Sequence, residues 1–335
     1  ANLLVKEVRS AAFQRHPYKN PTIGWSTDVQ KLTLDDVKRH YKEYYQPGNA
    51  TLVIVGDIDA TAALANVRKH FAGIAAGELP RPLRVVEPAQ RAEKRVYLKY
   101  GGAADVLSLA YHAPAFTDND AVALAVLEKI MISGVGGRLK SQLVDAKICT
   151  QARATYEVKK DPGLFVVNLN AQPGVGATRT LESFDQLVEQ LKNAPVADSE
   201  LRRARNHTEL QLLSERDGPY HNAFQLGFFD CLENWQSAYT WFVKLRTVSA
   251  SDVQRVARKY LTSESRVVGI LSGTGKSAPS KGSASKDSGS SNKAKGDKPS
   301  DDKDSKSKSD DKKTESSKSS GDKGKDDNKN KSDKS

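Results

Sequence analysis

Short apolar runs bounded by turn-forming residues predict β-strands at intervals along the chain. The expected strands are ATLVIVG from Ala50, RVYLKY, VLSLAYH, residues 150–158, residues 164–171 and RVVGIL. Asp161, Pro162 and Gly163 stand between the fourth and fifth of these runs and predict a hairpin turn there.

Longer stretches with helix signals fill most of the remaining chain. Thr33 and Asp36 form a Thr-x-x-Asp cap before DDVKRHYKEYY, a helix that Pro47 and Gly48 bring to an end. The N-terminal ANLLVKEVRSAAF predicts an amphipathic helix that the chain enters partway along. Further helices are expected after Asp57 and Asp59 through Phe71, and over residues 119–132, 138–147, 179–193, 198–215, 219–245 and 249–261.

A shift of 216 residues, with no gap, superimposes the first capped helix and its strand on the last helix and strand. It pairs Thr33 with Ser249, Asp36 with Asp252, Val37 with Val253, Arg39 with Arg255, Tyr44 with Tyr260 and Leu52 with Val268. This agreement predicts an internal duplication, of which the first copy lacks about 120 residues at its front.

The order of strand pairs and helices predicts an α+β fold. Each copy is expected to be a sandwich in which a mainly antiparallel sheet carries helices on one face. The predicted division is an incomplete first module (1–76), a linker with three prolines (77–94), a complete second module (95–273) and a disordered tail (274–335).

The tail changes how the charge of the protein is interpreted. The chain has a formal net charge of +11, but residues 276–335 hold 17 Lys and 12 Asp or Glu, with no aromatic or large aliphatic residue. Such a segment has nothing to bury, so we expect a solvated tether. Binding to a polyanion through its lysines is an alternative, which predicts steep salt dependence, although no aromatic residues are present to stack on bases.

Two cysteines, Cys149 and Cys231, are too few for a disulfide framework and leave the redox compartment open. No run of about 18 apolar residues predicts a membrane span. The N-terminus does not resemble a secretion signal, because Lys6, Glu7 and Arg9 interrupt any apolar core.

Candidate catalytic chemistry is sparse in this sequence. None of the six histidines forms HxxxH or HExxH spacing, and His40, His70 and His207 stand among charged residues typical of a solvated surface. His112 ends a strand beside Tyr111 and could line a cleft. SGVGGRL and PGVGAT predict helix-ending turns rather than phosphate cradles, because in neither does Lys-Ser/Thr directly follow a glycine and neither stands between a strand and a helix of a βαβ unit, and no GxSxG elbow occurs.

Several segments together resemble one peptidase family. FQRHPYKNPTIGW, LTLDDVKRHYKEYYQPGNATLVIVGDID, LAYHAPA, ISGVGGRLKSQLV, DPGLFVV and VSASDVQRVARKYLTSESRVVGIL occur in order over residues 1–273. They are similar to segments of the insulinase or pitrilysin-type zinc peptidases, the inverzincins, especially bacterial two-module members.

The resemblance implies a zinc site in the first module only. Family members carry HxxEH there, with two histidine ligands and a glutamate general base. In the second module of this chain the equivalent stretch has Ala125, Glu128 and Lys129, so both histidine positions are lost, and a surface or helix-stabilising role is expected for Glu128. The first-module motif is expected upstream of Ala1, so this chain alone should hold no metal and have no catalytic residue.

A second departure concerns residues that complete the active site from the second module. Where such family members have an arginine and, seven residues later, a tyrosine, this chain has Val144 and Gln151, unless a one-residue slip brings Cys149 or Thr150 into register. Valine offers no donor and glutamine no phenol for an oxyanion. Tyr111, His112 and Arg138 are the candidates for lining a substrate chamber.

The resemblance thus implies the C-terminal portion of a zinc metalloendopeptidase, whose two modules enclose a chamber for peptides. A non-catalytic structural or partner subunit of the same family is the alternative, and the presence or absence of HxxEH upstream would separate the two. Expected partners are the zinc-binding module, a related second subunit that supplies the missing Arg and Tyr, and peptide substrates, with no specific nucleic acid. A periplasmic or extracellular location is implied by the resemblance alone.

Overall fold

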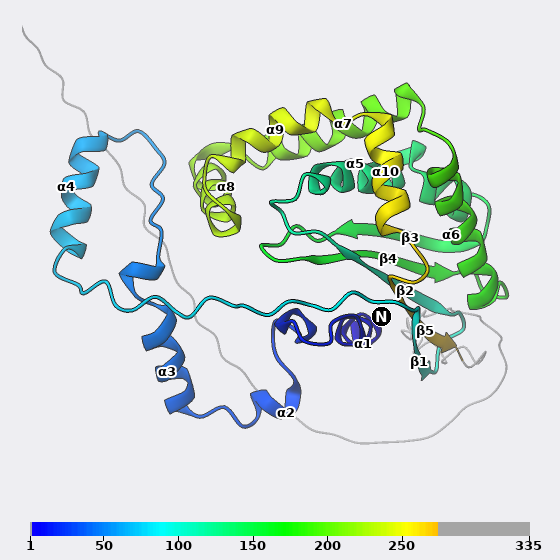
Figure 1. Cartoon of the computed structure of the whole chain (residues 1–335), viewed down its shortest axis with the longest axis horizontal. Helices are drawn as coiled ribbons and strands as arrows, with labels where there is room; N and C mark the ends of the chain where they lie inside the picture. The colour runs from blue at the N-terminus through cyan, green and yellow to red at the C-terminus, as the bar shows by residue number, and fades with distance from the viewer. Residues whose placement is uncertain (1, 274–335) are drawn as a thin grey trace, which may run out of the picture. The chain divides into compact units, whose positions relative to one another are not determined.

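A five-stranded sheet forms the centre of the computed structural model, which describes residues 2–273 (Figure 1). The strand order is β1-β5-β2-β4-β3; β1 and β5 run parallel and the other neighbours antiparallel. The strands are β1 Lys94–Tyr100, β2 Val106–Ala113, β3 Cys149–Tyr156, β4 Gly163–Ala171 and β5 Arg266–Gly273. The α+β prediction is therefore confirmed, and the predicted tail lies outside the described residues.

Ten α-helices surround this sheet or precede it within the described range. They are α1 Asn2–Ala12, α2 Ser26–Val29, α3 Leu34–Tyr44, α4 Ala60–Phe71, α5 Asp120–Ile132, α6 Gly176–Asn193, α7 Asp198–Ser214, α8 Gly218–Leu232, α9 Ser237–Thr247 and α10 Ala250–Tyr260. Over residues 2–273, no helix is both long and apolar enough to cross a bilayer.

Three predicted elements differ from the structure. ATLVIVG forms no strand: Leu52 and Ile54 are 58% and 47% exposed, and no other strand pairs with them in the described part of the chain. The helix predicted over 219–245 is two helices, because Asn234 Oδ1 accepts from the backbone N–H of Ser237 and starts α9 anew. The helix expected over 138–147 ends early, in a π-helical turn, Lys140–Val144.

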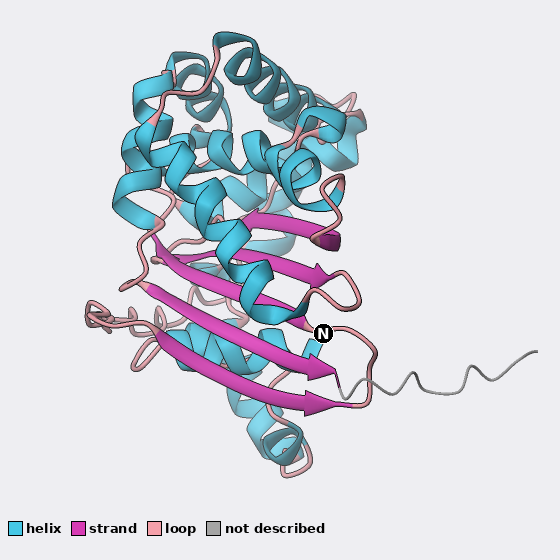
Figure 2. Ribbon diagram, turned by 90° about the vertical axis from the view of Figure 1, so that its right-hand side faces the viewer, coloured by secondary structure: helices cyan, strands magenta, loops and turns pink. Residues whose placement is uncertain are grey.

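Alternating side chains divide the sheet into two apolar faces. Leu107, Leu109 and Tyr111 of β2 point into the larger core beneath the helices, whereas Ala110 points to the other face. Figure 2 shows helices on both sides of the strands. The second face is covered by α1, which contacts β5, β2 and β1 and whose Leu4 and Val8 are buried in the apolar cluster on this face.

Gly269 of β5 allows α1 to lie close to this second face. A methyl group added to Gly269 would collide with Val8 and would stand 2.9 Å from Leu4 Cδ1. Because both side chains are buried, they have little room to move aside. The glycine therefore fixes how near the helix and strand can approach.

Helices α3 and α10 repeat each other at the predicted offset. Both are 11 residues long and both begin with a capping box, formed by Thr33 with Asp36 and by Ser249 with Asp252. Val253 of α10 is fully buried, whereas its counterpart Val37 in α3 is 55% exposed. The capped helix of the repeat is thus present twice and its strand only once, as β5, within the described residues, and the division into an incomplete and a complete module stays a prediction.

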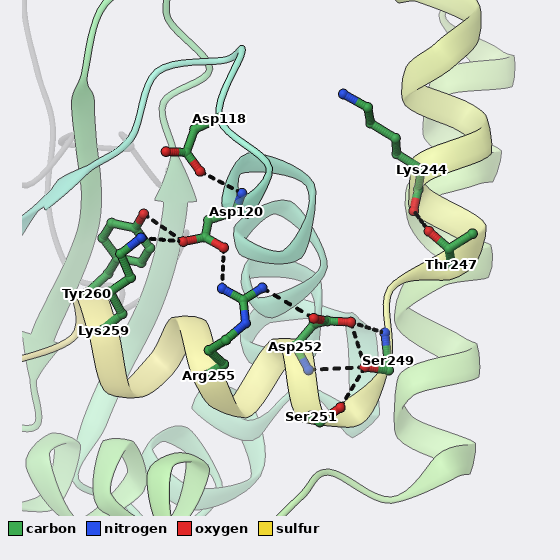
Figure 3. A network of polar contacts seen from close by, with 10 residues as sticks. All are labelled: Asp118, Asp120, Lys244, Thr247, Ser249, Ser251, Asp252, Arg255, Lys259 and Tyr260. Carbon is green, nitrogen blue, oxygen red and sulfur yellow. Dashed lines mark hydrogen bonds and ion pairs between the residues drawn. The ribbon is translucent and has the colours of Figure 1, made fainter.

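A buried carboxylate joins α10 to the start of α5 (Figure 3). Asp120 is 4% exposed and accepts hydrogen bonds from Arg255, from Lys259 (2.7 Å) and from the hydroxyl of Tyr260 (2.9 Å). Burial alone would raise the pKa of Asp120, but these three hydrogen bonds outweigh it and lower that pKa. The charged form therefore stabilises the contact between the two helices.

We expect Asp120→Asn to lower the free energy of unfolding by about 1 to 3 kcal/mol at pH 7, because two cations and a phenol lose their charged partner. The deficit should shrink below about pH 4, where the unfolded wild-type chain takes up the proton that the native carboxylate resists. Urea unfolding at both pH values measures this. The matched control is Asp145→Asn, whose exposed pair with Lys140 should contribute under about 1 kcal/mol; equal effects of the two variants would contradict the expectation.

Candidate functional site

The stretch Ala125 to Lys129 lies in the middle of α5. Ala125 is 8% exposed and Lys129 9%, and their neighbours Val126 and Leu127 are fully buried. Helix α5 contacts α7, α10 and β3. The degenerate motif is therefore part of the core.

Glu128 is the one carboxylate of this stretch. Its side chain is 13% exposed, so the expected surface position is wrong, and its Oε1 lies 3.3 Å from the ammonium of Lys129. Burial raises the pKa of Glu128, and the charge of Lys129 offsets part of that rise. Lys129 thus gives a half-buried carboxylate its counter-ion.

These residues do not fit a zinc ion. Zinc sites in proteins use three or four Cys, His or carboxylate ligands, whereas Ala125 has no ligand atom and Lys129 offers a positive charge. Residues 2–273 contain no group of three or more His, Cys, Asp or Glu side chains placed to hold a metal.

Val144 and Gln151 flank the entry to β3. Val144 packs against the larger core, and Gln151 is exposed, with its amide oxygen accepting from the guanidinium of Arg153 (3.1 and 3.0 Å). A bulge separates Cys149 from Gln151 in the pairing with β4. Neither residue carries a cationic donor or a phenol that could stabilise an oxyanion.

The three predicted chamber residues have separate surroundings. Arg138 forms a two-pronged ion pair with Glu200 of α7 (2.8 and 3.0 Å), so its guanidinium ties two elements together. Tyr111 is 1% exposed, and its hydroxyl accepts from Arg266 (3.3 Å), which places it in the core rather than on a surface. Burial raises the pKa of Tyr111 to about 12. His112, next to it, points away from that core and lines a cleft.

The remaining histidines divide into surface residues and one buried ring. His40, His70 and His207 are exposed, as expected. His16, for which no role was predicted, is 3% exposed. Its only sequence signal is its place in the turn-rich stretch before Gly24, which gives no indication of burial.

Comparisons with known proteins agree with this degenerate site. The family model described as peptidase M16 inactive domain matches residues 31–208, more than half of the chain. The chain therefore belongs to the M16 family of metallopeptidases, the insulinase or pitrilysin type, and resembles its inactive, C-terminal module.

Two curated relatives are zinc protease PqqE of Helicobacter pylori and a probable mitochondrial-processing peptidase subunit beta of Arabidopsis thaliana. The first is 27% identical over 255 residues, covering 75% of this chain and 57% of the relative. The second is 27% identical over 282 residues, covering 77% and 51%. The chain thus spans little more than half the length of these relatives.

Solved structures support the fold. A protease from Helicobacter pylori matches with a TM-score of 0.75 at 25% identity, covering 81% of this chain and 66% of the other. The peptidase M16 inactive domain from Pseudomonas fluorescens matches with a TM-score of 0.72 at 21% identity, covering 83% and 66%, and shows the fold alone.

We expect the purified chain to retain no stoichiometric zinc after dialysis, because the Ala125 and Lys129 positions lack ligand atoms. Metal analysis by mass spectrometry measures this. As a matched test, Ala125→His with Lys129→His restores the two imidazoles beside Glu128 and should raise zinc retention above that of wild type. About one tightly held zinc per wild-type chain would contradict this expectation.

Proposed function

We propose that this chain acts as the non-catalytic C-terminal module of a zinc-dependent M16 endopeptidase. In this role it forms one wall of a chamber in which peptides are held. A separate module, elsewhere in the same protein or in a second subunit, carries the zinc and hydrolyses the peptide bond.

The observation that carries this proposal is the state of α5. The helix is intact, buried and fixed at its start by Asp120, yet it offers no zinc ligands at Ala125 and Lys129. A degenerate site in a well-packed domain is consistent with a module kept for its shape rather than for catalysis. The zinc named in the description of the H. pylori relative supports zinc chemistry for the complete protein.

The proposal also includes a partner subunit, because of the residue types at Val144 and Gln151. A related subunit that presents an arginine and a tyrosine would provide the donors that these two residues lack. On this view the complete protein is a weak peptidase alone and gains activity in a pair. A periplasmic or extracellular location belongs to the same proposal and rests on family resemblance.

Mixing the full chain with an M16 zinc subunit that has an intact HxxEH tests the proposal. We expect cleavage of an unfolded fluorogenic peptide to rise at least about tenfold over that of the zinc subunit alone, because two modules are needed to close the chamber. A chelator should abolish the activity, and replacing the subunit's catalytic glutamate with glutamine should do the same.

Two outcomes would contradict it. Chelator-sensitive hydrolysis by this chain alone would mean that it holds a catalytic site of its own. Stable association with the zinc subunit and no gain in cleavage would favour the alternative, a purely structural subunit.

A further inference from the structure

A cleft of about 550 Å³ lies at one end of the sheet, away from the degenerate motif. Its walls come from residues 85–90, the end of β2, the turn before β4 and the end of α10. The polar side chains that line it belong to His16, Glu87, Gln90, His112, Asp161, Lys259, Tyr260 and Ser265. Its size is in the range of small-ligand sites.

Three residues that line this cleft each hold a buried polar atom with no hydrogen-bond partner among the described residues: Nε2 of His16, Oε1 of Gln90 and Nε2 of His112. The same part of the chain holds only three other such atoms, on Ser108, Ser133 and Arg205, and none of these residues lines the cleft. Because buried polar groups are normally paired, their concentration at one cleft points to a ligand that pairs with them.

His16 presents a donor to the cleft. Its Nδ1 accepts a hydrogen bond from the backbone N–H of Tyr18 (3.2 Å), so the neutral ring carries its proton on Nε2. That atom stands 3.5 Å from Asp161 Oδ2, a longer separation than a usual N–H···O bond. A tilted contact with Phe13 and an edge contact with Tyr18 hold the ring in place.

His112 presents an acceptor. Its ring lies edge-on against Phe13, with centroids 5.6 Å apart, and donates toward the carbonyl of Ala12. Because Nε2 is the nitrogen without a partner, this bond falls to Nδ1 and leaves the Nε2 lone pair free. Burial lowers the pKa of His112, which favours the neutral ring at pH 7.

Gln90 presents a second acceptor. Its Nε2 donates to the carbonyls of Glu264 (3.1 Å) and Arg266 (2.6 Å), and this fixes which end of the amide is left unpaired. Residues 85–90 belong to the stretch that the sequence identifies as a linker, so a segment without helix or strand supplies a fixed polar group.

Most charged groups around the cleft already have partners. Glu87 accepts from the backbone N–H groups of Gln14, Arg15 and His16. Lys259 and Tyr260 donate to Asp120. The exception is the carboxylate of Asp161, whose side chain is 41% exposed and whose Oδ2 lies 3.5 Å from Nε2 of His16. Its negative charge, beside one donor and two acceptors, does not suit a phosphate, and residues 2–273 hold no group of three side chains placed to bind a metal.

We propose that this cleft binds an amide group of a peptide, with its carbonyl accepting from His16 and its N–H donating to His112 or Gln90. A primary carboxamide carries one acceptor and two N–H donors, the complement of the three atoms, whereas a main-chain amide carries one acceptor and one donor. The inference deepens the proposed function, on which it rests for the presence of a peptide. Its test measures binding without hydrolysis, so its failure leaves the proposed function standing.

The test is a titration of the full chain, labelled with ¹⁵N in its histidine rings, followed by NMR. Two probes separate the sources of the amide: acetyl-trialanine methyl ester has only main-chain amides, and propionamide is a primary carboxamide. We expect the ring signals of His16 and His112 to shift with either probe, and those of His207 to stay unchanged. An analogue of the first probe with its amides replaced by esters lacks the N–H donors and should bind at least about fivefold more weakly.

Two variants keep the test independent of folding. His112→Phe retains the contact with Phe13 but removes the acceptor, and Gln90→Met removes the other one; each should weaken binding about 5- to 20-fold. Gln90→Met also loses the hydrogen bonds to Glu264 and Arg266, and His112→Phe the one to Ala12, so the thermal midpoint of each is measured to show that it is folded at the temperature of the titration. His207→Ala is the matched control. Unshifted ring signals up to about 10 mM of both probes, or equal affinity for the ester analogue, would overturn the proposal and mean that ordered water alone fills the cleft.

Discussion

The position of α5 constrains the whole second module. Eleven of its 13 residues are buried, so almost every side chain on it, polar or apolar, must find its partner inside the domain. Asp120 finds three on α10, and Glu128 and Lys129 find each other. The polar groups of this helix thus hold the module together, and none is left to take part in metal chemistry.

Sequence patterns predicted those elements whose signals are local. Thr33 and Ser249 cap their helices as the Thr-x-x-Asp and Ser-x-x-Asp spacing indicated, and the strands of the second module appear where apolar runs were found. The strand predicted over ATLVIVG is wrong. A strand needs a neighbouring strand to pair with, and the residues of the segment itself do not show whether one is present. The break between α8 and α9 rests on one asparagine side chain, Asn234, without a Gly or Pro to mark it.

The candidate site likewise has features that the sequence could predict and features that it could not. The loss of ligands at Ala125 and Lys129 could be predicted from residue types alone, because chemistry without ligand atoms is excluded in any conformation. The burial of Glu128 could not be predicted from the sequence, because it depends on helices from elsewhere in the chain that pack against α5. The cleft was missed for the same reason: His16, Gln90 and His112 are far apart in sequence, and the tautomer of His112 depends on the carbonyl of Ala12, which only the fold brings near.

Helix α5 is a structural helix whose motif positions belong to the core. Native-state hydrogen exchange of its amides, with and without added zinc, tests this most directly. We expect these amides to exchange only through global unfolding of the domain built on the sheet, those of α3 to exchange much faster, and zinc to change neither. Fast local exchange across Ala125 to Lys129, slowed by zinc, would instead show a labile helix that a metal organises.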